Sequence, residues 1–423
     1  MVDNSIIFFK RYLNRGDLLI INGKYNFAKV FTENIDKVTI SQIETFLDQD
    51  FSKDTSIRIM PDCHAGIGSV IGFTADLKDK VIPNIVGVDI GCGMLVVELG
   101  KISIDLQKLD ETIQTIPSGF KTHNKIYQDF KKLETLNMYK ELKDPLRLKK
   151  SIGTLGGGNH FIEIDKDDDD NLYLVIHSGS RNLGTQVAKF YQNLALENCI
   201  EDKELVFEKR KLQDKLNKSE DKKETKKMLK KVEKSLKKSD TKYPKDLCYI
   251  EGRKREEYLE DMSIAQEYAS LNRRTIANII LEKMWNKNID EYNNWETVHN
   301  YIDLDSNIIR KGAISAKKDE KVLIPMNMRD GALICIGKGN PQWNYSAPHG
   351  AGRLMSRRDA FDSLNMEEFK NEMKDIYSTS ISTKTLDEAP MAYKPTEEII
   401  NSIEDTVTII KQIKPIYNYK SSD

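Results

Sequence analysis

Short apolar runs bounded by glycine, aspartate or asparagine recur along the chain. Runs of this length between turn residues are typical of buried strands. Two of them lie within residues 153–184, on either side of an acidic tract, and each adjoins a glycine-rich turn. The same pattern predicts strands at residues 18–22, 56–60, 94–99, 322–324 and 332–336.

Longer segments show the apolar spacing of amphipathic helices. A short helix is predicted at residues 39–47, with Thr39 or Ser41 as its N-cap, because a hydroxyl can accept from the first free backbone N–H groups. After the last predicted helix, an extended tail is expected to run through Lys420. The other helices are predicted at residues 104–145, 185–199, 256–287 and 397–411.

Residues 201–240 differ from the rest of the chain. They contain 15 basic and 10 acidic residues, and neither glycine nor proline. Apolar residues keep helical spacing in each half, which predicts two helices in a charged hairpin that projects from the body. A solvated arm is the simpler interpretation. The alternative is a basic arm that grips RNA phosphates, to which a net charge of +5 would contribute modestly.

The alternation of strands and helices predicts an α+β fold. We expect one large mixed α/β catalytic domain over residues 1–423, with residues 201–240 inserted into it as the protruding charged hairpin. A chain of this length would allow about three domains. However, no repeat with a period of 20–50 residues and no structureless linker divides the sequence.

Composition bears mainly on the cellular compartment. The 65 basic and 66 acidic residues give a net charge of −1, which does not exclude nucleic acid because binding depends on a local patch. The five cysteines are scattered and odd in number, as in proteins of a reducing compartment. Residues 1–24 lack the apolar core of a signal peptide, and no run approaches ~20 apolar residues. These features predict a soluble, cytoplasmic protein.

Histidines are the first candidates for chemistry. Of the six in the chain, only His123 lies in an ordinary helical context. The other five lie in glycine-rich or polar turns, an arrangement that packing explains poorly. They are His64, His160, His177, His299 and His349.

Asp89 and Cys92 add a carboxylate and a thiol three residues apart, across a turn that contains glycine. Cysteine and histidine together favour Zn²⁺, Fe²⁺, Co²⁺ or Mn²⁺, and a carboxylate shifts the preference toward the harder ions. One thiol, one carboxylate and three imidazoles exceed the needs of one tetrahedral ion. They would suit two ions that share a ligand, an arrangement common in phosphoryl transfer. Alternatively, Cys92 is a small buried apolar residue.

Three glycine-rich turns, at residues 156–159, 178–181 and 349–353, offer backbone N–H groups of the kind that bind phosphate. Arg181 and Arg353 lie in two of them. An imidazole such as His349 among phosphate-binding groups can attack phosphorus and form a phosphoramidate. If the segment is helical, Arg353 and Arg357 would share one helix face and could clamp the same phosphate.

Together these motifs resemble the RtcB family of RNA ligases, which join RNA 3′-phosphate and 5′-hydroxyl ends. The resemblance runs in order through nearly the whole chain and ends at Lys420. It is carried by Met60-Pro-Asp62-x-His64, Val86-Gly-Val-Asp89-Ile-Gly-Cys92-Gly-Met94, Gly153-Thr-Leu-Gly-Gly-Gly-Asn159-His160-Phe, His177-Ser-Gly-Ser-Arg181-Asn-x-Gly184, His299-Asn300-Tyr301, Arg310-Lys-Gly-Ala313, His349-Gly350-Ala-Gly352-Arg353-x-Met-Ser-Arg357 and Asp387-Glu-Ala-Pro390.

The resemblance implies an enzyme of the RtcB fold that depends on GTP and two Mn²⁺ ions. By this resemblance, His349 is guanylylated by GTP, and GMP passes to an RNA 3′-phosphate before a 5′-hydroxyl displaces it. A 2′,3′-cyclic phosphate is first opened to the 3′-phosphate. The implied metal ligands are Asp89, Cys92, His160, His177 and His299, with Cys92 shared.

The remaining motif positions correspond to contacts with nucleotide and RNA. The guanylate would contact Asn159, Glu163, Asn300, Gly350, Gly352 and Lys420. The RNA end and its phosphate would contact Asp62, His64, Arg181, Arg353 and Arg357. Implied partners are GTP, RNA with 3′-phosphate or 2′,3′-cyclic phosphate and 5′-hydroxyl ends, and an archease-like activator, with the enzyme acting as a monomer in RNA repair or tRNA splicing.

Two features depart from the family pattern. The family commonly has a Pro-Gly-Ser-Met-Gly turn where this chain has Pro325-Met-Asn-Met328-Arg-Asp-Gly331, and the hairpin at residues 201–240 is longer than the family core requires. Two other functions remain open. One is a two-metal phosphodiesterase or phosphatase acting on RNA ends, and the other is an RNA- or partner-binding protein that acts through the hairpin.

Overall fold

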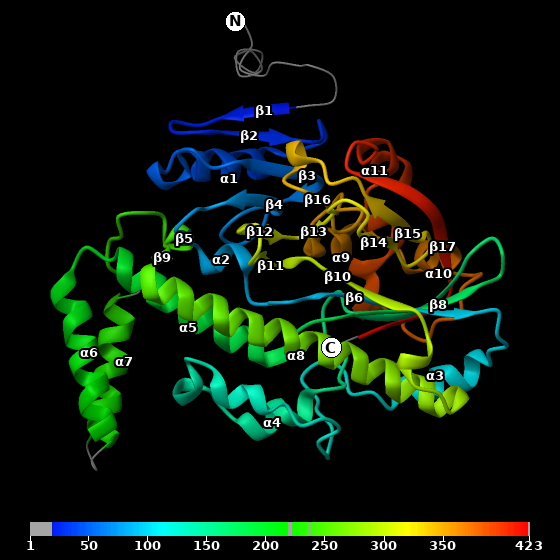
Figure 1. Ribbon diagram of the computed structural model, residues 1–423, viewed down its shortest axis with the longest axis horizontal. Helices are drawn as coiled ribbons and strands as arrows, with labels where there is room; N and C mark the ends of the chain where they lie inside the picture. Colours follow the sequence, from blue (N-terminus) through cyan, green and yellow to red (C-terminus); the bar gives the residue numbers. More distant parts are fainter. Residues whose placement is uncertain (1–18, 219–221, 237, 422–423) are drawn as a thin grey trace, which may run out of the picture.

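The computed structural model describes residues 19–218, 222–236 and 238–421, and it confirms the predicted α+β fold. A six-stranded sheet lies in the upper half of Figure 1, with strand order β1-β2-β3-β4-β12-β11. Its pairs are antiparallel except for the parallel pair β2 and β3. The strands are β1 (Leu19–Asn22), β2 (Phe27–Val30), β3 (Ile57–His64), β4 (Ile71–Asp76), β12 (Ile308–Lys311) and β11 (Asn300–Asp303).

A seven-stranded antiparallel sheet has the order β10-β6-β8-β7-β17-β15-β14. The two strands predicted within residues 153–184, which are β7 and β8, lie near its centre. Its strands are β10 (Asn294–Val298), β6 (Gly93–Gly100), β8 (Leu172–Ser178), β7 (Phe161–Lys166), β17 (Val407–Lys420), β15 (Gly331–Gly337) and β14 (Lys321–Asn327).

Helix α8 (Gly252–Trp285) joins the cores of the two sheets. Its N-terminal half buries Tyr258 and Tyr268 in the apolar cluster beneath the six-stranded sheet. Its C-terminal half buries Ile276 and Ile280 in a second cluster against β6, β7 and β8. Helix α5 (Arg181–Cys199) lies alongside α8 (Figure 1). The two sheets are therefore held in a fixed relation by one rigid element.

The remaining elements are short. Helix α1 packs beside β1 and β2, and α3 lies against the C-terminal half of α8 (Figure 1). These elements are α1 (Lys37–Leu47), α2 (Pro83–Val86), α3 (Leu106–Gln114), α4 (Pro145–Ser151), α9 (Arg357–Ser363), α10 (Met366–Glu372), α11 (Thr396–Ser402), β5 (Lys80–Val81), β9 (Ile250–Glu251), β13 (Ala313–Ser315) and β16 (Ser346–Pro348).

The predicted charged hairpin is present as α6 (Lys203–Lys218) and α7 (Lys222–Leu236), and it extends from the body where α5 ends (Figure 1). Val206, Leu212, Val232 and Leu236 form a small apolar cluster of its own with Ile200 at its base. Residues 219–221, the predicted turn, lie outside the described residues.

The helix predicted at residues 104–145 is wrong beyond Gln114. Helix α3 ends there, and only two 3-10 turns, Lys131–Thr135 and Tyr139–Glu141, precede α4. Pro117 lacks the backbone N–H that a continuing helix would need. Leu133, Leu136 and Met138 supply the apolar periodicity by packing into the first core as an irregular segment.

The helix predicted at residues 397–411 is also wrong in its second half. Helix α11 ends at Ser402, and β17 begins at Val407. Residues 407–410 are all β-branched, and pairing with β15 gives them a place in the sheet. The N-cap of α1 also differs from the prediction: Oδ1 of Asp36 accepts from the backbone N–H groups of Val38 and Thr39, at 2.8 and 2.9 Å.

Within the described part of the chain, no helix is long and apolar enough to cross a membrane. The predicted absence of a signal peptide concerns residues that mostly lie outside the described part, because that part begins at Leu19.

Candidate active site

The register of the central sheet brings distant segments to one edge. A single row of paired residues crosses five strands, from β10 to β17. At this edge, β6 and β7 begin, whereas β10, β8 and β17 end, so the turns that carry the candidate side chains converge. The row consists of Thr297, Met94, His177, Phe161 and Lys420.

Cys92 lies at the centre of the candidate metal ligands. Its Sγ atom is 3.4 Å from Nε2 of His160 and 3.2 Å from Nε2 of His177. His160 Nε2 is also 3.4 Å from Oδ2 of Asp89, and this contact lowers the pKa of the Asp89 carboxyl to about 2 although burial opposes the shift. In all three contacts, both atoms are of the kind that binds metal ions. Such atoms are expected to lie this close together where a cation can bind between them.

His299 lies beside these residues, with its ring centroid 5.1 Å from that of His177. Burial lowers the pKa of both imidazoles well below the usual range and so keeps them neutral. Nδ1 of His160 and Nδ1 of His299 are buried and find no hydrogen-bond partner among the described residues.

The donor set fits a transition-metal centre. Burial raises the pKa of the Cys92 thiol well above its usual value, so a thiolate there would need a cation beside it. A neutral imidazole, such as that of His177 or His299, is the form that binds a metal ion. The ligand atoms of Cys92, His160 and His177 lie within 4.8 Å of one another, close enough to share an ion.

His349 faces this group from another part of the fold. It follows β16, and its ring centroid lies 4.9 Å from that of His299. Its Nδ1 atom lies 2.6 Å from Oδ2 of Asp62, and its backbone N–H donates to the same oxygen at 3.1 Å. A carboxylate can only accept, so Nδ1 of His349 carries the proton and Nε2 keeps its lone pair.

Gly352 explains why this turn can lie so close to β3. Its φ is +74°, and a Cβ atom there would be 2.6 Å from the carbonyl oxygen of Asp62. Any side chain would therefore push the 349–352 turn away and break the contact between Asp62 and His349. Sequence reasoning placed Asp62 near the RNA end, whereas its fully buried carboxylate contacts the imidazole.

A second group of charges surrounds Glu388. Nζ of Lys420 is 2.6 Å from Oε2 of Glu388, and Tyr393 donates its hydroxyl to the same oxygen at 2.7 Å. Arg357 and Arg353 approach Oε1 at 3.0 and 3.4 Å. Burial alone would raise the pKa of Glu388, but the charges of Lys420 and Arg357 lower it to about 2.

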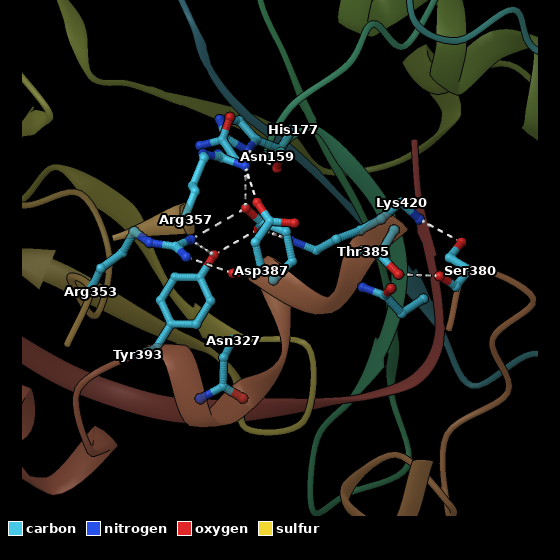
Figure 2. Close-up of polar contacts among 12 residues, drawn as sticks. Asn159, His177, Asn327, Arg353, Arg357, Ser380, Thr385, Asp387, Tyr393 and Lys420 are labelled. Carbon is cyan, nitrogen blue, oxygen red and sulfur yellow. Dashed lines mark hydrogen bonds and ion pairs between the residues drawn. The ribbon is translucent and has the colours of Figure 1, made fainter. Parts of the chain in front are cut away.

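Figure 2 shows Arg353, Arg357, Tyr393 and Lys420 converging on this region from separate segments. The segment is not helical at Arg353, so the condition for a shared helix face is not met: α9 begins at Arg357 and Arg353 precedes it. Arg353 instead donates to the carbonyl oxygen of Asp387 at 2.6 Å. Both arginines still contact the Glu388 carboxylate, Arg353 from the turn before α9 and Arg357 from the first residue of α9.

Glu163 lies deeper in the site, on β7. It accepts a hydrogen bond from Nδ2 of Asn418 on the neighbouring strand. Burial raises the pKa of Glu163 to about 7, and the charge of Lys420 opposes that rise. Asp165, two residues along the same face, is fully buried, and both its carboxylate oxygens lack a hydrogen-bond partner among the described residues. Burial raises the pKa of Asp165 well above its usual value, so it stays neutral.

The groups line one cavity of about 320 Å³. Most of the sequence-derived candidates meet there. Asn300 lines it while its Oδ1 accepts from the Gly312 backbone N–H at 2.9 Å. The candidates that line the cavity are His64, Asp89, Cys92, Asn159, Glu163, His177, His299, Asn300, His349, Gly350, Gly352, Arg353, Arg357 and Lys420.

Arg181, assigned to the RNA end by sequence, lies behind the glycine-rich turn and not in the cavity lining. It donates to Oγ1 of Thr154 at 3.1 Å and to the carbonyl oxygen of Gly119 at 2.6 Å. In this structure it therefore holds the turn that carries Asn159 and His160.

Several functional residues were missed by sequence reasoning. Glu388 was quoted within a motif but given no role, and Tyr393 and Asn418 were not singled out. Arg273 is buried in α8 and donates at 2.8 Å to the carbonyl oxygens of Gly91 and Ser178, so it fixes two turns of the site. Its position in a long helix carries no local signal, since arginine is common on solvated helix faces.

Comparison with known proteins agrees with this geometry. A family model described as tRNA-splicing ligase RtcB matches residues 52–421. The chain belongs to the RtcB family.

Individual RtcB relatives are distant but cover most of the chain. RNA-splicing ligase RtcB of Escherichia coli (strain K12) is 29% identical over 399 residues, which span 85% of this chain and 88% of the relative. RNA-splicing ligase RtcB1 of Escherichia coli (strain ATCC 25922) has the same identity and coverage. tRNA-splicing ligase RtcB of Nanoarchaeum equitans is 25% identical over 458 residues, covering 85% and 86% of the two chains.

The turn that departs from the RtcB pattern lies at the cavity. Pro325, Asn327 and Met328 are among its lining residues. The side chain of Asn327 is held by Asp330, because its Nδ2 donates to Oδ2 of Asp330 at 2.8 Å. Met326 and Met328 are buried, so apolar side chains close this edge of the cavity.

Proposed function

We propose that this chain, an RNA ligase by its family, joins an RNA 3′-phosphate or 2′,3′-cyclic phosphate to a 5′-hydroxyl, with GTP as the energy source and His349 as the nucleotide carrier. The contact between Asp62 and His349 carries the proposal. A carboxylate that fixes the proton on Nδ1 leaves Nε2 as a nucleophile, and this nitrogen faces a cavity lined by cationic groups. A two-metal hydrolase would use its ions to activate water and would not need a covalent intermediate on this nitrogen.

The first step is attack by Nε2 of His349 on the α-phosphorus of GTP. The new P–N bond forms as the bond between the α-phosphorus and its bridging oxygen breaks, and pyrophosphate leaves. Asp62 stabilises the positive charge that develops on the imidazole. Because the same carboxylate also accepts the backbone N–H of His349, ring and backbone are positioned together.

The next two steps move the nucleotide and then the RNA. An oxygen of the RNA 3′-phosphate attacks the phosphorus of the GMP–His349 adduct, and the P–N bond breaks. The 5′-hydroxyl then attacks the activated 3′-phosphorus, and GMP leaves as a new phosphodiester forms. A 2′,3′-cyclic phosphate would first be hydrolysed to the 3′-phosphate in the same cavity.

Two Mn²⁺ ions fit the donors on the opposite wall. Asp89, Cys92, His160, His177 and His299 would hold them, with Cys92 central because its Sγ contacts two imidazoles. When bound, the ions supply positive charge that stabilises attacking and leaving oxygens in phosphoryl transfer. Arg273 and Arg181 keep the turns that carry these donors in place.

The Glu388 cluster is suited to nucleotide binding. Arg353, Arg357 and Lys420 already converge on one buried carboxylate, so their positive charges are concentrated at the cavity wall. Glu163 can accept from the N1–H and N2–H₂ groups of guanine in its ionised form. Because the pKa of Glu163 is raised to about 7, the ionised form is populated from about neutral pH upward.

Labelling with radioactive GTP tests the proposal directly. Wild-type protein incubated with Mn²⁺ and α-labelled GTP should retain label through denaturing electrophoresis, and His349→Ala should retain none. His123→Gln is the matched histidine control, because His123 is not among the cavity-lining residues, and it should label like wild type.

The competing two-metal phosphodiesterase or phosphatase makes the opposite prediction. It needs the same metal ligands but no nucleophilic histidine. Absence of labelled wild-type protein, or RNA-end hydrolysis that persists in His349→Ala without GTP, would overturn the ligase mechanism.

A further inference from the structure

The turn at residues 118–121 holds an aromatic ring in solvent. Phe120 is 89% exposed, more than any other large hydrophobic side chain among the described residues. Its backbone is nevertheless fixed: the Lys121 N–H donates to the Ser118 carbonyl at 3.1 Å, and Arg147 donates to the Phe120 carbonyl at 2.7 Å. An exposed aromatic ring on a hydrogen-bonded turn is suited to stacking on a planar partner.

This turn is tied to the glycine-rich turn of the active site. The Gly119 N–H donates to the carbonyl of Gly156, and the Leu155 N–H donates to the carbonyl of Pro117, both at 3.0 Å. Arg181 adds a hydrogen bond to the Gly119 carbonyl at 2.6 Å. The position of Phe120 is therefore coupled to the segment that carries Asn159 and His160.

A second cavity of about 600 Å³ lies between this turn and the segment at residues 379–384. Its lining is rich in hydroxyl and cationic groups. Lys420 borders both this cavity and the catalytic one: its backbone N–H donates to Ser380, whereas its Nζ lies 2.6 Å from Glu388. In Figure 2, Lys420 lies between the Arg353 and Arg357 cluster and Ser380. The polar lining residues include Gln114, Ser118, Lys121, Ser382, Thr383 and Lys384.

We propose that Phe120 and this second cavity form a platform for the single-stranded RNA that leads to the reacting end. This inference rests on the proposed RNA ligase function. Phe120 stacks on one base, Lys121 and Lys384 face phosphates, and the hydroxyls of Ser118 and Ser382 contact the ribose-phosphate backbone. The combination of an exposed ring, lysines and hydroxyls is the one that binds single strands without sequence preference.

A single-stranded ligand fits better than a duplex or a protein. A duplex hides the faces of its bases, whereas a single strand can lay one base on Phe120 and continue past Lys420 into the catalytic cavity. A protein partner would be expected to bury a wider apolar surface than one ring beside a polar cavity.

Fluorescence anisotropy with a short fluorescein-labelled RNA that ends in a 3′-phosphate tests the platform. Phe120→Ala should weaken binding by about tenfold, because stacking on an aromatic side chain contributes that order of affinity per base. Phe120→Tyr should restore it. Phe27→Ala is the matched control, since Phe27 is 45% exposed on β2, which Figure 1 shows on the far side of the fold from α4.

Salt dependence tests the phosphate contacts. Lys384→Ala should lower the slope of log affinity against log salt by about 0.7, the value for one phosphate contact on a single strand. In ligation assays, Phe120→Ala should raise KM for RNA and leave the labelling of His349 by GTP unchanged.

The outcomes separate this inference from the proposed function. Wild-type protein that takes no label from GTP would overturn the ligase mechanism. Normal labelling combined with equal RNA affinity in wild type and Phe120→Ala would overturn the platform alone. Loss of binding to a protein partner, with RNA affinity unchanged, would assign the ring to a protein interface and also overturn the platform.

Discussion

At the scale of single residues, one carboxylate decides the chemistry available to His349. An imidazole free to rotate would offer either nitrogen, and each tautomer would be populated. The buried Asp62 accepts from both the ring and the backbone of His349, so one tautomer and one orientation are selected. In the proposed mechanism, Asp62 is a positioning residue that does not itself need to touch the nucleotide.

Replacing Asp62 by asparagine should therefore slow the covalent step without removing the nucleotide site. An amide can donate to Nδ1 and so favours the wrong tautomer, which we expect to lower the rate of His349 labelling by about 10²- to 10⁴-fold. The KM for GTP should change little. Asp170→Asn, in an exposed turn, is the matched control and should label at the wild-type rate. An unchanged rate in Asp62→Asn would contradict the positioning role.

The Glu388 cluster predicts a dependence of stability on pH. The pKa of Glu388 lies at about 2 in the folded protein and near 4.5 in the unfolded chain, so the folded state binds fewer protons between these values. The stabilisation is fully present above about pH 4.5 and is lost as the pH falls toward 2. It amounts to about 3 kcal/mol for a shift of this size.

Urea unfolding of wild type and Glu388→Gln at a series of pH values measures this contribution. The difference in the free energy of unfolding between the two should shrink as the pH falls below 4.5, because glutamine does not titrate. Glu367→Gln, at a side chain that is 83% exposed, is the control and should show no such trend. A constant difference for Glu388→Gln at all pH values would contradict the cluster's role.

At the scale of elements, the α6–α7 hairpin is nearly self-contained. Its apolar residues pack mainly against one another. Its two ends lie side by side, because the Glu201 N–H donates to the Asp240 carbonyl at 3.3 Å and the Lys242 N–H donates to the Cys199 carbonyl at 3.0 Å. One ion pair, between Lys209 and Glu197, links it to α5. The main cores do not depend on it.

Deleting residues 203–238 and joining the ends with a short glycine-serine turn should leave the catalytic body folded. We expect cooperative unfolding, Mn²⁺ binding and labelling of His349 by GTP to be retained, because neither sheet loses a core residue. Any loss should appear in the affinity for RNA and would then assign the basic hairpin to RNA binding. A deletion variant that folds but no longer takes label from GTP would show that the hairpin is needed for the covalent step.

At the scale of the whole molecule, the site exists only where the two sheets meet. The metal-type donors come from one edge of the seven-stranded sheet and from the turn before β11, whereas Asp62 comes from β3 of the other sheet. The described fold holds them together through α8, which packs into both cores. An unfolded chain would have no such arrangement, so the proposed metal binding would be coupled to folding.

Added Mn²⁺ should accordingly raise the free energy of unfolding, by about 2.7 kcal/mol at a concentration a hundredfold above Kd. Cys92→Ala should lose most of this gain because Cys92 contacts two imidazole ligands. Cys335→Ala, at a buried thiol in β15, is the matched control and should keep the gain even if its own stability is lower. An equal gain in Cys92→Ala would contradict the assignment of Cys92 as a central ligand.

Most residues that the sequence singled out lie around one cavity, whereas two of the predicted helices were wrong in part. The glycine-rich turns beside His160, His177 and His349 are local patterns. The sequence alone therefore shows both these turns and the metal-binding residue types next to them. The segment after α3 and the start of β17 were misjudged because apolar spacing alone cannot show which partner will bury a side chain. A strand such as β17 is chosen by its pairing with β15 and β7.

By itself, then, the sequence determined the kinds of groups present: metal-type donors, glycine-rich turns, a histidine in a separate motif and a charged helical hairpin. Only the tertiary structure decided which of these meet. Asp62 and His349 are 287 residues apart, and Glu388 and Lys420 are 32 apart on different elements. Such pairs form because strand register and buried hydrogen bonds leave few other ways to satisfy polar groups in a packed interior, and no local pattern records that constraint.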